Sequence, residues 1–179
     1  MLNKPAGYIT ATMDDSEPTV LELFSDFPLL DKLFPIGRLD KDTEGLLILT
    51  TDGQFAHRIS HPKWNVNKEY YVKVEGDVSK IDFREFERKG VYLRSDRYQT
   101  KPFKVFILTS SDHYSELFIT VSEGKYHIVK KIMAQLDHPV LYLKRVRVGN
   151  LRLDDSLEPG EYRELTEEEI KELKGSVKL

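Results

Sequence analysis

The chain has 179 residues, of which 40% are hydrophobic and 11% aromatic, a composition typical of a folded globular protein rather than a disordered one. It contains no cysteine, which excludes a disulfide framework, a thiolate zinc site and a cysteine nucleophile, and its five histidines lack tight metal-ligand spacing. With a net charge of −3, no apolar run near the ~20 residues of a membrane-spanning helix and no secretory-signal pattern, the sequence predicts a cytoplasmic protein.

The first half of the chain combines turns, short strands and short helices. In chain order, the predicted elements are a strand end and turn at Leu2–Gly7, a short helix at Thr19–Phe24, a buried strand at Leu46–Thr50, a helix at Gln54–Ser60 and a strand at Tyr70–Val74. Asp52 stands where it can cap the second of these helices.

The second half is richer in strands. A helix is predicted to start at Ser79, with Phe83 and Phe86 as its apolar side. The pattern then predicts a helix at Tyr126–Leu136 and strands at Lys104–Thr109, Glu116–Ser122, Val140–Val148 and Leu151–Leu153. Thr166 and Glu169 form a capping-box pattern that opens a last helix. Because strands outnumber helices and follow one another at hairpin-like spacing, we expect an α+β fold with a mainly antiparallel sheet.

Charge is unevenly distributed along the chain. Asp154–Leu179 holds nine acidic and four basic residues, whereas Lys125–Arg147 holds six Lys or Arg and one Asp. A concentrated basic patch can bind phosphates even when the whole protein is mildly acidic. A charge run is nevertheless more often a solvated face, so this pattern alone does not establish a nucleic-acid partner.

The most informative stretch is Gly37–Gly53, which reads GRLDKDTEGLLILTTDG. If residues 38–40 are extended, Arg38 and Asp40 project from the same face. A neighbouring cation keeps a partly buried carboxylate ionised, as a carboxylate nucleophile requires. From the spacing alone, a structural ion pair that supports a loop is the more common explanation, so the residues by themselves do not identify a reaction.

Four stretches resemble, in the same order, the motifs of the RsuA-like ribosomal RNA pseudouridine synthases. They are NKPAG at Asn3–Gly7, GRLDKDTEGLLILTTDGQ from Gly37, KEYYV from Lys68 and EGKYHIVKKIM at Glu123–Met133. The resemblance covers essentially the whole chain. It implies the pseudouridine synthase fold, a mainly antiparallel mixed sheet with flanking helices and a central active-site cleft.

The resemblance also implies roles for individual residues. Asp40 would be the catalytic carboxylate and Lys130 the basic residue that pairs with it. Tyr70 would line the uridine pocket and stack on the uracil, whereas Tyr71, on the other face of the strand, is the better core candidate. Arg38 would contact RNA phosphate or help displace the target base. For Lys4 a structural role and a phosphate-binding role are equally open. Lys131 should face solvent or RNA.

The reaction implied is isomerisation of uridine to its C-glycoside without cofactor or metal. Asp40 would break the N-glycosidic bond, either by attack at C1′ or by assisting proton removal from C2′. A uridine in folded RNA must be extruded to reach such a carboxylate, at a cost of a few kcal/mol. The partner would be ribosomal RNA, and NKPAGYITAT, GQFAHRIS and NKEYYVKV favour the small-subunit branch.

The chain departs from the family pattern in two places. The usual N-terminal RNA-binding domain is not expected ahead of Asn3, so residues 1–179 are interpreted as one catalytic domain with two subdomains sharing one sheet. Ile128 occupies a position where a polar residue such as Gln is expected. The alternatives are a large-subunit synthase, a non-catalytic RNA-binding assembly factor and, last, a carboxylate-dependent hydrolase. A monomer is expected because single-site modification requires no symmetry.

Overall fold

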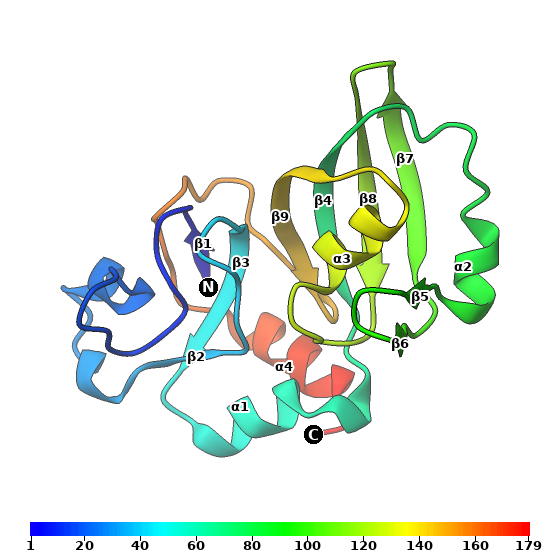
Figure 1. Ribbon diagram of the computed structural model, residues 1–179. Helices are drawn as coiled ribbons and strands as arrows, with labels where there is room; N and C mark the ends of the chain where they lie inside the picture. Colours follow the sequence, from blue (N-terminus) through cyan, green and yellow to red (C-terminus); the bar gives the residue numbers. More distant parts are fainter. The chain divides into compact units, whose positions relative to one another are not determined.

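The computed structural model describes residues 1–179, which form two compact units. The first unit comprises residues 1–66 and 145–179, and the second comprises residues 67–144. The chain therefore leaves the first unit once, and it returns within a single strand, β9 (Val140–Val148). Figure 1 shows the elements of each unit in sequence colours. No helix is long and apolar enough to cross a membrane.

The first unit is built around β3 (Glu44–Thr50), which pairs antiparallel with both β1 (Leu2–Lys4) and β2 (Phe34–Ile36). The end of β9 turns through Gly149 into β10 (Leu151–Arg152). The unit's helices are η1 (Val20–Phe24), η2 (Leu30–Lys32), α1 (Gly53–Ser60), η3 (Pro62–Trp64) and α4 (Glu167–Ser176). The strands predicted in this part of the chain are confirmed.

Apolar residues spaced along α1, α4 and β3 form the core of this unit. Ala56 and Ile59 of α1 and Leu173 of α4 pack with Leu46 and Ile48 of β3. The two predicted helix caps are confirmed. Asp52 Oδ1 accepts hydrogen bonds from the backbone N–H groups of Gln54 and Phe55, and Thr166 with Glu169 forms the capping box of α4.

The second unit contains strands in the order β9, β4 (Lys68–Glu75), β8 (Tyr114–Val121) and β7 (Lys104–Ser110). β8 pairs antiparallel with β4 on one side and β7 on the other. Two helices, α2 (Arg84–Lys89) and α3 (Ile128–Gln135), and a hairpin of β5 (Tyr92–Leu93) and β6 (Tyr98–Gln99) complete it. α3 lies against one face of the strands (Figure 1), and every second residue is buried from Tyr70 to Val74 in β4 and from Ser115 to Val121 in β8.

Three helix predictions require correction. The helix predicted from Ser79 begins only at Arg84, because the Ser79 N–H bonds to Asp77 Oδ1 and Asp82 Oδ1 accepts from the Arg84 N–H. The short helix predicted at Thr19–Phe24 is present as the 3-10 helix η1, but it starts at Val20, with Thr19 as its N-cap. The helix predicted from Tyr126 begins at Ile128, because His127 has a left-handed backbone conformation with φ of 55°.

Candidate active site

The loop between β2 and β3 carries Arg38 and Asp40, and both ends of this loop are fixed by the strands of the first unit. Leu39 is buried, and it anchors the loop between Arg38, which is exposed, and Asp40, which is half-buried. The Thr10 hydroxyl accepts a hydrogen bond from the Leu39 N–H (3.1 Å) and donates one to the Leu39 carbonyl (2.8 Å). The position of Asp40 is thus set by its buried neighbour.

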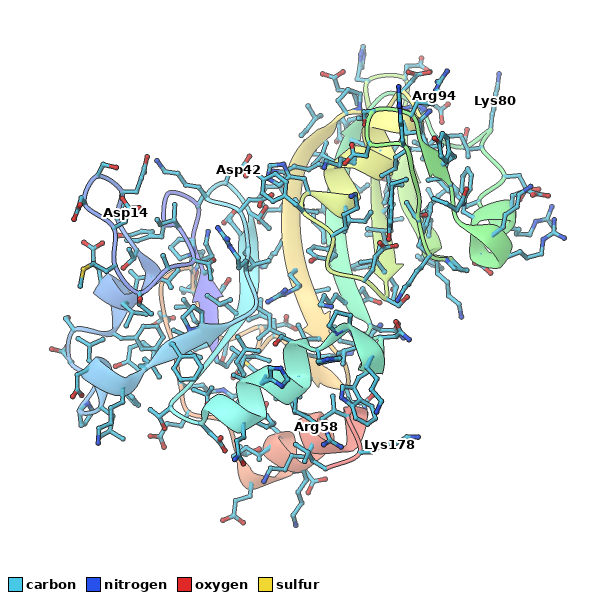
Figure 2. All side chains as sticks on the ribbon, turned by 60° about the horizontal axis from the view of Figure 1, so that its bottom comes forward. Asp14, Asp42, Arg58, Lys80, Arg94 and Lys178 are labelled. Carbon is cyan, nitrogen blue, oxygen red and sulfur yellow. The ribbon has the colours of Figure 1, made fainter.

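Lys4 binds the same loop from β1. Its ammonium donates to the carbonyl oxygens of Asp40 (3.0 Å), Lys41 (3.2 Å) and Thr43 (2.8 Å), and also to that of Pro5. The side chain is fully buried, and burial lowers the pKa of Lys4 to about 8, against the opposing effect of the carboxylates of Asp42, Asp40 and Glu44. A buried cation that binds several carbonyl groups in this way organises the loop rather than a ligand. Figure 2 labels Asp42 in this loop, where it is exposed.

Arg38 does not form the structural ion pair with Asp40 that the sequence left open. Its side chain is exposed to solvent, and the ion pairs of the loop do not include it. The alternative that Arg38 and Asp40 form an ion pair that supports the loop does not hold, since Lys4 and Thr10 provide that support. Arg38 is placed where it can contact a ligand approaching from solvent.

Tyr70 and Lys130 belong to the second unit. Tyr70 lies in β4 opposite Ile119 of β8 and is 8% exposed, whereas Lys130 is half-buried on α3, next to the buried Val129. The expectation that Tyr71 is the better core candidate is wrong. Tyr71 lies on the less buried face of β4, with Phe118 and Tyr142 at 6.0 and 5.9 Å between ring centroids, because α3 covers the opposite face.

The basic segment Lys125–Arg147 does not form one patch. Arg145 is buried, and its Nε donates to the Leu46 carbonyl at 2.9 Å; Arg147 donates to the Gly149 carbonyl at 2.6 Å. Lys131, expected to face solvent or RNA, is only partly exposed and pairs with Asp96 at 2.7 Å. Several of these charges therefore have structural partners within their own unit.

Comparison with known proteins identifies the family. Residues 1–135 match the family model of RNA pseudouridylate synthases. The chain is 46% identical over 170 residues to an uncharacterized RNA pseudouridine synthase, YtzG, of Bacillus subtilis, and 45% identical over 170 residues to ribosomal small subunit pseudouridine synthase A of Escherichia coli. These alignments cover 95% of this chain and 70% and 71% of the two relatives.

The chain belongs to the RNA pseudouridylate synthase family. A crystal structure of a pseudouridylate synthase superposes with a TM-score of 0.86 and 42% identity over 96% of this chain and 71% of that one. The predicted α+β pseudouridine synthase fold is confirmed, and so is the prediction of an RNA-modifying isomerase.

Two residues, Thr10 and Lys4, position the Asp40 loop of this pseudouridine synthase, and the sequence assigned no role to Thr10. Thr10 lies outside the four motifs, and nothing in its local sequence points to a contact with Leu39, which is 29 positions away. For Lys4, the structure decides between the two open roles in favour of the structural one. The sequence signal for that role is its place in the NKPAG motif, where Lys4 is the last residue of a buried strand.

Proposed function

We propose that this pseudouridine synthase isomerises a uridine of small-subunit ribosomal RNA, with Asp40 as the catalytic carboxylate. The observation that carries the proposal is the organisation of the Asp40 loop, in which Lys4 and Thr10 bind the backbone on both sides of a half-buried carboxylate. A reacting group must be held to a fraction of an ångström, and a loop fixed at its carbonyl groups meets that requirement.

In the proposed reaction, the target uridine is extruded from the RNA and its N-glycosidic bond is broken with the help of Asp40. The freed uracil turns and is rejoined to the sugar through C5. Tyr70 is proposed to stack on the uracil, and Lys130 to keep Asp40 ionised and oriented. Arg38, exposed beside Asp40 in the loop, is proposed to contact RNA phosphate or to help displace the base. The chemistry proposed requires no cofactor and no metal.

The proposed target follows from the relatives. Synthases of Escherichia coli, Salmonella typhimurium and Haemophilus influenzae named for the small ribosomal subunit are 44–45% identical to this chain over at least 95% of its length. We further propose that the enzyme acts as a cytoplasmic monomer and that residues 1–179 function as one catalytic domain.

Tritium release tests the target. The wild-type protein is incubated with small-subunit and with large-subunit ribosomal RNA, each transcribed with [5-³H]uridine, because transfer of the glycosidic bond to C5 releases the tritium. We expect release from the small-subunit transcript or its assembly intermediate, and mapping of the product to one nucleotide. Release only from large-subunit RNA would overturn the target. Binding without release from any of these RNAs would favour the non-catalytic assembly factor.

A further inference from the structure

The β5–β6 turn and the segment that leads into α3 form a basic and aromatic surface in the second unit. It consists of Arg94, Arg97, Lys125, Tyr126 and Lys131, and we refer to it as the Tyr126 platform. Residues 94–97 and 125–131 together contain five Lys or Arg and one carboxylate, Asp96. The surface is therefore strongly cationic although the whole chain is not.

Ion pairs hold the two segments together. The Asp96 carboxylate accepts from the Lys131 ammonium at 2.7 Å and lies 3.6 Å from that of Lys125. The Arg94 backbone N–H donates to Gln135 Oε1 of α3 at 2.9 Å. The turn is thus fixed to the helix, and its cationic side chains are presented from a defined scaffold.

The aromatic group of the platform is unusually exposed. Tyr126 has 68% of its surface exposed, and one side of its ring stacks on His127 with centroids 3.7 Å apart and planes 20° from parallel. The Lys131 ammonium lies 5.5 Å from the centre of the Tyr126 ring. Left-handed backbone at His127 (φ 55°) and at Arg97 (φ 50°) is costly for residues other than glycine and persists where surrounding contacts impose it.

The side chains of the two arginines in the turn are directed away from the fold. Arg94 and Arg97 are exposed, and their guanidinium groups donate no hydrogen bond within the protein. In Figure 2, Arg94 points outward from the second unit into solvent. Lys125 differs, because its ammonium lies 4.3 Å from the centre of the Tyr98 ring as well as near Asp96.

We propose that the Tyr126 platform binds a single-stranded segment of the RNA substrate, with a base stacked on Tyr126 and phosphates bound by Arg94 and Arg97. The inference rests on the proposed function, since it assigns this surface to the same RNA. An exposed ring beside solvent-facing guanidinium groups matches what single-stranded RNA offers, which is base faces separated by phosphates. An acidic protein partner would use the charges but would leave the exposed ring without a planar group to stack on.

The test measures RNA binding separately from catalysis. Binding of fluorescein-labelled oligouridylate is followed by anisotropy in the Asp40→Ala background, so that a failure of the proposed reaction leaves this measurement intact. Tyr126→Ala should weaken binding about tenfold, the order expected for one stacked base, whereas Tyr126→Phe should bind like the parent. Arg94→Ala/Arg97→Ala should lower the slope of log K against log salt by about 0.7 for each phosphate that is no longer bound.

A charge-matched control is available on α4. Lys171→Ala/Lys174→Ala removes the same charge from exposed positions of a helix rich in glutamate, and should leave both affinity and slope unchanged. In the protein that retains Asp40, Tyr126→Ala should raise KM for ribosomal RNA. It should leave the single-turnover rate constant at saturating RNA unchanged. The proposal would be overturned if the parent protein did not bind oligouridylate, or if Tyr126→Ala and Tyr126→Phe bound it with equal affinity. It would also be overturned if the arginine and lysine double variants lost affinity equally.

Discussion

Among the single residues, the most informative is a buried lysine whose ammonium group binds the backbone of the Asp40 loop. Lys4 is fully buried, and the cost of burying its charge is visible in a pKa lowered to about 8. Its ammonium group is directed at carbonyl groups in and next to Asp40 in the chain. We infer that the loop would lose its defined conformation if these carbonyls lacked a cationic donor.

Replacing this lysine should damage catalysis more than replacing Lys41, a surface lysine of the same loop. Lys4→Met keeps the side-chain length but removes every donor, and we expect kcat to fall about 100-fold, the effect of an ångström-scale displacement of a reacting group. Lys41→Met is the matched control, because the Lys41 ammonium pairs with Glu17 at the surface. Tritium release at saturating RNA checks both, and a Lys4→Met enzyme with wild-type kcat would contradict the role.

Among the structural elements, β3 and the end of β9 approach each other at a glycine. Gly45 has φ of 107°, and a Cβ built there would overlap the backbone carbonyl oxygen of Arg145. The Arg145 side chain in turn donates to the Leu46 carbonyl. The close contact of the two strands in the first unit therefore depends on the absence of a side chain at one position.

Two glycine substitutions test this contact against each other. Gly45→Ala should lower the free energy of unfolding by about 3 kcal/mol, since it combines left-handed backbone strain with a backbone clash. Gly53→Ala, at the first position of α1 with open space around it, should be neutral or stabilising by up to about 1 kcal/mol. Urea unfolding of the two variants decides the point, and similar midpoints would refute the close-approach explanation.

Ion pairs in the C-terminal segment should make the free energy of unfolding depend on pH. Arg163 binds the carboxylates of Glu169 (2.7 Å) and Asp154 (2.8 Å). The hydrogen bond from Arg163 is the largest cause that lowers the pKa of Glu169, to about 2. The pKa of Asp154 is also lowered to about 2, mainly by the hydrogen bond from the Ser156 hydroxyl and next by that from Arg163. Folded pKa values below the unfolded ones mean that this stabilisation is complete above about pH 4.5 and is lost as the pH falls toward 2.

The Arg163→Met variant should therefore unfold at lower urea than wild type at pH 7, with the difference shrinking on acidification toward pH 2. Arg84→Met serves as the control, because Arg84 and Asp82 are both well exposed and such pairs contribute little. A stability difference between Arg163→Met and wild type that stays constant from pH 7 to pH 2 would contradict the linkage.

Elements with strong local signals were predictable, and elements set by distant contacts were not. Asp52 and the Thr166–Glu169 pair mark their helices because a cap is a local interaction. The left-handed His127 shortens α3, and the choice of Tyr70 over Tyr71 for the buried face depends on which side α3 covers. The motifs predict a role for the loop that follows β2, but the hydrogen bonds between Thr10 and Leu39 join residues too far apart for any local pattern to show.

For the whole molecule, the proposed site residues divide evenly between the two units. Arg38 and Asp40 lie in the first, and Tyr70 and Lys130 in the second, together with the Tyr126 platform. The net charge of −3 does not reveal the cationic Tyr126 platform, because nine acidic residues lie in the last 26 positions of the chain and outweigh it. The overall charge of a small enzyme is thus a poor guide to whether it binds RNA.

The proposed function depends above all on Asp40, and tritium release by its variants is the decisive measurement. Asp40→Ala and Asp40→Asn are compared with wild type on [5-³H]uridine-labelled small-subunit ribosomal RNA, with Asp42→Asn as the control for removal of an exposed carboxylate from the same loop. We predict that both Asp40 variants lose at least about 10,000-fold in rate, as enzymes do without their principal catalytic group, while Asp42→Asn stays active. Asp40→Ala turning over within about tenfold of wild type would contradict the assignment of Asp40 as the catalytic carboxylate.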